Sequence, residues 1–223
     1  MRSESIRYLI VPGWQGSPDD HWQSHWQRTL PNSSRVEQAD WLTPRRDDWV
    51  AELQRSVASD ARPVVLVAHS LGCITVAHWA AQAPQELLRR VRGALLVAPA
   101  DVQRGNCPEA LRNFAPIPRQ PLPFASLLIG SDNDTAASAA RAVELGRDWG
   151  SETAILAGAG HYQREIRASP LGAGFRLPVS PAEPYRAERP QARLKRGGRI
   201  AEINFPGKLA QRLPDSLRDT GST

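Results

Sequence analysis

Residues 64–73 read VVLVAHSLGC, in which five apolar residues run directly into a histidine and a serine. Val64–Ala68 is uncharged and rich in β-branched side chains, a pattern typical of a strand that is buried on both faces. Ile74–Gln82 then predicts a helix. Ser70 therefore lies in a turn between a buried strand and a helix, with only two residues left to form the corner.

A serine in this position has the layout of a nucleophile elbow, in which a strained backbone bend pushes the serine Oγ out above the sheet. Small residues at Ala68 and Gly72 let the strand and the helix approach each other, although glycine is more usual at the first of these positions. His69 is expected to point away from Ser70 and to be structural. Cys73, one turn into the helix, is expected to be a core residue rather than a reactive thiol.

The rest of the first 161 residues alternates between strand and helix patterns. Further strands are predicted at Arg7–Val11, Arg35–Ala39, Ala94–Ala98, Ala125–Gly130 and Thr153–Ala157. Further helices are predicted from an N-cap at Ser17 to Leu30, over Arg46–Ser56 and over Ala136–Trp149. This alternation predicts an α/β fold with a doubly wound, mostly parallel six-stranded sheet.

The length and composition limit the class of protein. A chain of 223 residues can form one sizeable core. It has no apolar run long enough to cross a membrane, and its first apolar stretch is too short for a signal peptide. Two cysteines make no disulfide framework, so we expect a cytoplasmic protein without a membrane partner.

The charge is unevenly distributed along the chain. The net charge is +5, yet residues 162–223 hold 12 basic and 6 acidic residues, while all seven tryptophans precede them. The first 161 residues are therefore nearly neutral, and the basic tail lacks the interleaved aromatic residues of a nucleic-acid-binding segment. We predict a domain over residues 1–161, an irregular, disordered Pro/Arg-rich tail over residues 162–223, and no nucleic-acid partner.

Three polar residues follow predicted strands in an order that suits nucleophilic catalysis. A serine hydroxyl needs a base within hydrogen-bond reach, and the base needs an acid to orient it. Ser70, Asp134 and His161 follow the third, fifth and sixth strands, in the order serine, acid, histidine. Asp132, in the same loop as Asp134, is an alternative acid. Asp101 is another, but it follows the fourth predicted strand rather than the fifth.

The oxyanion formed during acyl transfer needs backbone N–H donors. One is expected from Leu71, directly after the serine, and a second from Trp14 or Gln15 in the loop after the first strand. Trp14 could equally wall an acyl pocket or simply pack as an aromatic residue.

No cofactor or metal is predicted. His21 and His25 have the i, i+4 spacing of zinc-binding HExxH helices, but no glutamate follows His21. We interpret both as packed or solvent-facing helix residues.

Several motifs together resemble one family: PGWQGSPDDHWQSHW, VAHSLGC, LLVAPAD, IGSDND and DWGSE followed by GAGH. Over residues 6–161 the chain is similar to small bacterial serine hydrolases of the retinoblastoma-binding-protein-nine family. The resemblance implies a minimal α/β-hydrolase fold without a large lid, the triad Ser70, Asp134 and His161, and cofactor-free esterase-like activity on small acyl substrates. Thr135-Ala136 replaces the family's common Pro-Tyr after the acid, and the LxCxE retinoblastoma-binding motif is absent.

The resemblance stops at His161. Members of the family usually continue with INAxSG, a tryptophan and a final helix, whereas this chain reads GHYQREIRASPLGAG. Removing one base from a permitted back-translation gives INAKSGLRPWAQ, so we hypothesise a one-nucleotide frameshift just after the His161 codon. Its expected consequences are an intact triad with a poorly braced histidine, an exposed apolar patch, and a melting point several degrees below that of a frame-restored chain.

The sequence thus predicts a serine hydrolase that acts on small carboxylic esters. Two alternatives remain, a non-catalytic partner-binding protein on the same fold and a product impaired by the frameshift. The oligomeric state, the acyl chain and the leaving group are not predicted.

Overall fold

The computed structural model describes residues 6–161, in which six parallel strands form one sheet in the order β2-β1-β3-β4-β5-β6. The strands are β1 (Arg7–Val11), β2 (Ser33–Arg35), β3 (Val64–His69), β4 (Val91–Val97), β5 (Ser126–Ser131) and β6 (Glu152–Leu156). The helices are α1 (Trp22–Thr29), α2 (Arg46–Ala58), α3 (Leu71–Gln82), α4 (Gln85–Leu88), α5 (Ala139–Trp149) and the 3-10 helix η1 (Glu109–Phe114). The predicted tail and the frameshift lie outside the described residues.

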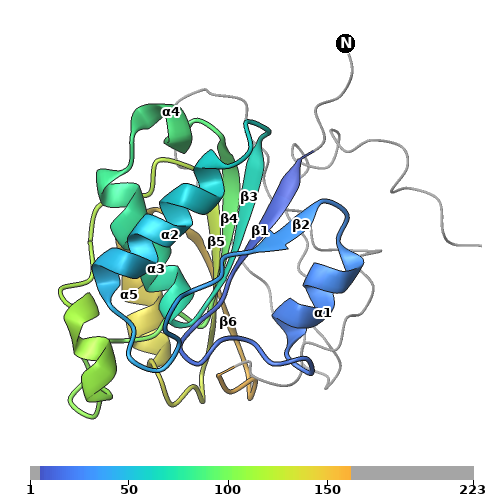
Figure 1. The fold of residues 1–223 in the computed structure, drawn as a ribbon. Coiled ribbons are helices and arrows are strands. Elements are labelled where there is room, and N and C mark those ends of the chain that lie inside the picture. The colour runs from blue at the N-terminus through green and yellow to red at the C-terminus, as the bar shows by residue number, and fades with distance from the viewer. Residues whose placement is uncertain (1–5, 162–223) are drawn as a thin grey trace, which may run out of the picture.

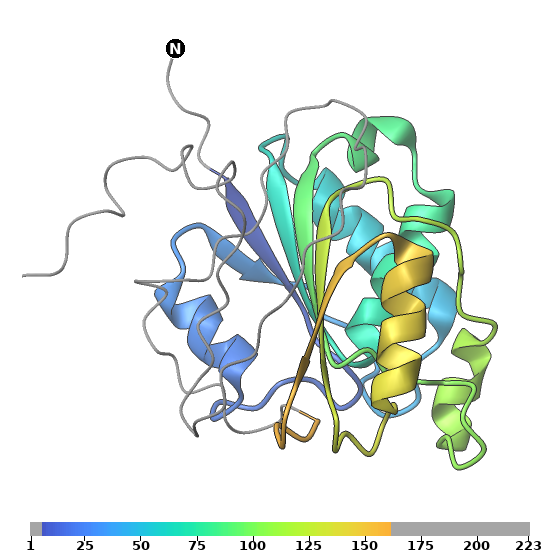
Figure 2. The ribbon, with the colours of Figure 1, turned by 180° about the vertical axis from the view of Figure 1, so that it is seen from behind.

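Helices cover both faces of the sheet, as predicted for a doubly wound fold. Helices α2, α3 and α5 pack on one face, and α1 lies on the other (Figures 1 and 2). None of the helices within residues 6–161 combines the length and apolar character that a membrane span requires.

The apolar pattern of the central strands explains the two layers of core. All six residues of β3 are buried, and alternate side chains enter opposite clusters. Val64, Leu66 and Ala68 join the cluster that includes Trp49 and Trp79 under α2 and α3. On the other face, a second cluster contains Val65 and Val67 from β3, with Trp22 and Trp26 from α1. A strand that is buried on both faces is the expected state of a central parallel strand.

The register of the sheet aligns the strand ends at one edge. Val11 pairs with Ala68, His69 with Val97 and Ser131 with Leu156. The chain runs from β1 outward to β2 and then crosses back to β3, so the loops after β1 and β3 flank the point where the strand order reverses. Ligands bind at such a point in open α/β sheets.

The start of α1 differs from its prediction. His21, not Ser17, is the N-cap, and its Nδ1 accepts from the Gln23 N–H at 3.2 Å. The Ser17 hydroxyl instead donates to Gln23 Oε1, and its carbonyl accepts from the Ser24 hydroxyl. Ser17 therefore hydrogen-bonds side chains in the first turn of α1 and does not cap the N-terminus of the helix.

Other element boundaries also differ from their predictions. The second strand spans Ser33–Arg35 rather than Arg35–Ala39, because β1 ends at Val11 and the following Pro12 has no N–H with which to extend the ladder. Helix α5 begins at Ala139, three residues later than predicted, where the Ser138 hydroxyl caps it by accepting from Arg141 N–H. The short helices α4 and η1 were not predicted.

Candidate functional site

Ser70 lies in the strained corner that the sequence predicts. Its backbone has φ 53° and ψ −120°, a left-handed region that non-glycine residues rarely adopt. Its N–H donates to the carbonyl of Val97 on the neighbouring strand at 2.9 Å. The side chain sits at the edge of the sheet where β3 becomes α3, and the residue is 9% exposed.

Two glycines allow this corner to exist. A Cβ on Gly72 would lie 2.3 Å from the carbonyl oxygen of Val11 and 2.6 Å from that of Pro12, so no side chain fits between α3 and the end of β1. A Cβ on Gly13 would lie 2.8 Å from the Cβ of Ser70. The loop after β1 therefore passes directly against the elbow, and the close approach at position 72 is to the end of β1 rather than to the strand that precedes Ser70.

Ser70, His161 and Asp134 form one hydrogen-bonded chain. His161 Nε2 lies 2.8 Å from Ser70 Oγ, and His161 Nδ1 lies 2.9 and 3.0 Å from the two oxygens of Asp134. The Asp134 side chain is 2% exposed and also accepts from the Ala136 N–H at 2.7 Å. The three side chains come from the loops after β3, β5 and β6, and their geometry suits proton transfer from the serine to the imidazole.

The two alternative acids have other partners. Asp132 Oδ1 accepts from the N–H of Gly158 at 2.7 Å. Asp101 faces the guanidinium of Arg141 at 3.4 Å and accepts from the N–H of Gln103. Neither carboxylate contacts the imidazole of His161.

The loop carrying His161 is hydrogen-bonded to the end of β5 and the loop after it by side chains from four consecutive residues. Ser131 Oγ accepts from Ala159 N–H, Asp132 from Gly158 N–H, Asn133 from Gly160 N–H, and Asp134 from His161 Nδ1. Ser131 also donates to Asn133 Oδ1 at 2.8 Å. Together with one bond from His69, these bonds hold the loop of His161 within the described residues, whereas the expectation of a poorly braced histidine concerns the segment after His161, which lies outside them.

His69 is buried, and its Nε2 lies 2.9 Å from the carbonyl oxygen of His161. Burial lowers the pKa of His69 well below its usual value, and the neighbouring His161 and His21 lower it further. The ring centroids of His69 and His161 are 5.1 Å apart. The sequence predicts a structural role for His69, and the structure gives it one specific contact, with the loop that carries the base.

The candidate oxyanion donors differ in availability. Leu71 is the first residue of α3, where backbone N–H groups have no partner inside the helix. The Gln15 N–H already donates to the Trp41 carbonyl at 3.1 Å. The indole N–H of Trp14 donates to the Leu42 carbonyl at 2.9 Å, but within residues 6–161 its backbone N–H has no hydrogen-bond acceptor.

Sequence reasoning missed Gln23. This fully buried side chain donates from Nε2 to the carbonyls of Val11 and Val67, at 3.2 and 3.0 Å. It ties the ends of β1 and β3 together beside the elbow. A lone glutamine among tryptophans on a helix carries no local signal of such a bridge.

The remaining candidate residues are accounted for by packing. Cys73 is fully buried, as predicted, and burial raises the pKa of its thiol strongly. His21 caps α1 and packs its ring 4.9 Å from that of His69. Over residues 6–161 no cluster of three or more histidine, cysteine, aspartate or glutamate side chains could hold a metal ion.

Comparisons with known proteins show the family and the fold of the chain. The chain matches the Serine hydrolase family over residues 8–177. The crystal structure of a YdeN-like hydrolase from Pectobacterium atrosepticum is 32% identical, with a TM-score of 0.61, covering 71% of this chain and 80% of its own. The comparison with curated proteins gave no match.

Two more distant structures share the fold. The YdeN protein of B. subtilis is 18% identical, with a TM-score of 0.56 over 71% of this chain and 88% of its own. Est1E from Butyrivibrio proteoclasticus, solved with ferulic acid bound, is 13% identical, with a TM-score of 0.60 over 73% and 84%. The neighbours identify the architecture as an α/β-hydrolase fold, and the family match covers most of the chain. The protein belongs to the serine hydrolase family.

Proposed function

We propose that this protein hydrolyses small carboxylic esters through an acyl-serine intermediate, as a member of the group that resembles retinoblastoma-binding protein nine. The observation that carries the proposal is the continuous chain from Asp134 through His161 to Ser70, with hydrogen-bond distances of 2.8 to 3.0 Å. No other described carboxylate contacts the His161 imidazole.

In the first half of the reaction, Ser70 Oγ attacks the ester carbonyl while His161 Nε2 takes the serine proton. The tetrahedral oxyanion is stabilised by the N–H groups of Leu71 and Trp14. The intermediate collapses, the C–O bond to the alcohol breaks, and His161 returns the proton to the departing alcohol. Asp134 holds the imidazole in the tautomer that leaves Nε2 free to accept.

In the second half, water attacks the acyl-serine. His161 removes a proton from that water, a second oxyanion forms at the same two N–H groups, and the ester bond to Ser70 breaks. The proton returns to Ser70 Oγ, and the carboxylic acid leaves. One ester and one water thus give one alcohol and one acid.

A fluorophosphonate probe tests the proposal. Wild-type protein is expected to be labelled once per chain, Ser70→Ala not at all, and the exposed control Ser59→Ala as fully as wild type. Hydrolysis of p-nitrophenyl esters of graded chain length then identifies the preferred acyl group. Folded wild-type protein that takes no label, or Ser70→Ala that still does, would contradict the proposal, and the first result would favour a binding protein on the same fold.

A further inference from the structure

We propose that His69 is a positioning residue that holds the main chain of His161 at the distance from Ser70 that proton transfer requires. The inference rests on the proposed hydrolase function. It assigns a catalytic consequence to a residue that does not itself contact the reacting atoms.

The first observation is a hydrogen bond between residues that are 92 positions apart. His69 Nε2 lies 2.9 Å from the carbonyl oxygen of His161. A carbonyl can only accept, so the imidazole is the donor and its proton is on Nε2. Burial favours the neutral form of this ring by lowering its pKa, and a neutral imidazole has a single N–H to give.

The second observation is that the His69 ring is packed on more than one side. Its centroid lies 4.9 Å from that of His21, 5.1 Å from that of His161, and 6.1 Å from Trp22, whose ring it meets edge to face. The residue is 4% exposed. A ring held in this way aims its N–H in one direction, toward the His161 carbonyl.

The third observation concerns the elements that the bond from His69 connects. His69 is the last residue of β3 and is covalently joined to Ser70, whereas the other described side chains that hydrogen-bond the His161 loop come from the end of β5 and the loop after it. Among the described hydrogen bonds of His161, two reach the β3 corner. One is the Nε2 contact with Ser70 Oγ, which the reaction breaks each time the serine forms its acyl bond.

Among the described hydrogen bonds, the one from His69 therefore links base and nucleophile throughout the reaction. Without it, the His161 loop can shift with the β5 loop relative to β3. A displacement of about 1 Å between reacting groups can cost roughly 100-fold in rate. Such a displacement would act on kcat, because the proposed oxyanion donors, Leu71 and Trp14, belong to the β1 and β3 side and keep their positions.

Three substitutions of His69 separate positioning from packing. His69→Leu fills the space without a donor. His69→Gln places an amide N–H close to the position of the imidazole Nε2, and His69→Asn keeps the amide but is too short to reach the carbonyl. The expected result is a kcat about 10- to 100-fold below wild type for Leu and Asn, and within about fivefold for Gln, with KM changed by less than about threefold in all three.

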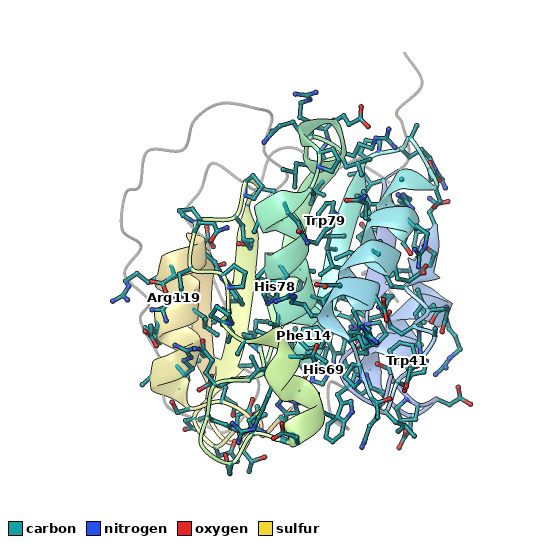
Figure 3. All side chains as sticks on the ribbon, turned by 60° about the vertical axis from the view of Figure 1, so that its left-hand side comes forward. Trp41, His69, His78, Trp79, Phe114 and Arg119 are labelled. Atoms are coloured by element: carbon teal, nitrogen blue, oxygen red, sulfur yellow. The ribbon has the colours of Figure 1, made fainter. Side chains whose placement is uncertain are left out.

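His78 supplies the matched control. It lies further along α3 (Figure 3), and its Nε2 bonds the Phe114 carbonyl at 2.7 Å, so it makes the same kind of imidazole-to-carbonyl contact away from the site. His78→Leu should lower the melting temperature to an extent similar to His69→Leu, yet leave kcat within about threefold of wild type. Rates are measured on p-nitrophenyl acetate and divided by the sites that the fluorophosphonate titrates.

The possible outcomes are distinct. A loss of kcat in His69→Leu and His69→Asn that His69→Gln does not show supports the proposal. If His69→Leu does not fold, the comparison of His69→Gln with His69→Asn decides it alone. Equal activity of Gln and Asn, wild-type kcat in His69→Leu, or the same loss of kcat in His78→Leu overturns it. Wild-type protein without labelling would overturn the proposed function and this inference together.

Discussion

The two halves of the candidate site are positioned by different forces. Ser70 sits at the centre of the sheet, between a fully buried β3 and the first turn of α3, and close main-chain packing fixes its corner. His161 sits beyond β6, an edge strand none of whose residues is fully buried, and hydrogen bonds from side chains hold its loop. Close main-chain packing thus positions Ser70, and hydrogen bonds position His161.

This difference predicts how each half fails. There is no room for an added atom near Ser70, so a larger side chain there should lower the free energy of unfolding. Removing a hydrogen-bond acceptor near His161 leaves the sheet intact but loosens the loop, so such a substitution should lower kcat first. Substitutions in the two halves should therefore separate folding from chemistry.

The largest effect is expected at the base. Asp134→Asn replaces the acceptor of the His161 Nδ1 proton with a group that can donate to it and favours the wrong tautomer, so kcat should fall by roughly 10³- to 10⁴-fold. Asp132→Asn is the matched control, because it makes the same change two residues away, on the Gly158 N–H. Steady-state hydrolysis of a p-nitrophenyl ester measures both. Comparable losses in the two variants would contradict the assignment of Asp134 as the acid.

The next effect concerns the elbow itself. Gly72→Ala forces a Cβ against the carbonyls of Val11 and Pro12, so the free energy of unfolding should fall by about 3 kcal/mol. For a chain of this size the melting temperature should then drop by roughly 6–12 °C. The control is Gly105→Ala, where a Cβ meets nothing within 4 Å. Thermal melts followed by circular dichroism compare them, and equal melting temperatures would show that the elbow is not tightly packed.

A smaller effect is expected in the polar half. Asn133 Oδ1 accepts from the Gly160 N–H at 2.6 Å and from the Ser131 hydroxyl at 2.8 Å. Asn133→Ala removes both bonds and should cost about 1–2 kcal/mol of stability and lower kcat roughly 10-fold.

Asn106→Ala, an exposed asparagine in a loop outside the site, controls for the change in side chain. If Asn133→Ala loses stability but keeps its full kcat, the loop is not a determinant of base position, and the contrast between the two halves weakens.

The central half could be predicted from the sequence because its signals are local. An uncharged β-branched run, a serine and two small residues within nine positions predict the strand and the corner that follows it. The order of the strand-end residues predicted which loops meet, because the carboxyl ends of parallel strands share one edge. That shared edge is the basis on which the sequence predicts Ser70, Asp134 and His161 as one site.

The polar half could not be predicted to the same depth. Asp132 and Asn133 gave no sequence signal that they fasten the loop of His161, since their partners are backbone N–H groups 26 and 27 residues away. The same holds for His69, whose acceptor is a carbonyl. The N-cap at His21 was missed because Ser17 has the better capping pattern, but its hydroxyl is taken by Gln23.

The smallest predicted effect is the response of stability to acid, and His21 is its clearest source. Burial, followed by the positive charge of Arg35, lowers the pKa of His21 from 6.5 to about 4, while Asp20 acts in the opposite direction. The unfolded chain therefore binds a proton between these pH values that the folded chain does not. Stability from this residue is complete above pH 6.5 and is lost as the pH falls toward 4.

His21→Asn tests this origin, because asparagine is a good N-cap and does not titrate. The melting temperature of the wild type should fall between pH 6.5 and 4, and that of His21→Asn should fall less steeply. Some slope should persist in the variant, because the pKa of His69 is lowered by burial as well. Parallel curves for the two proteins would mean that folding does not lower the pKa of His21, and that burial of its ring is not a source of the acid sensitivity.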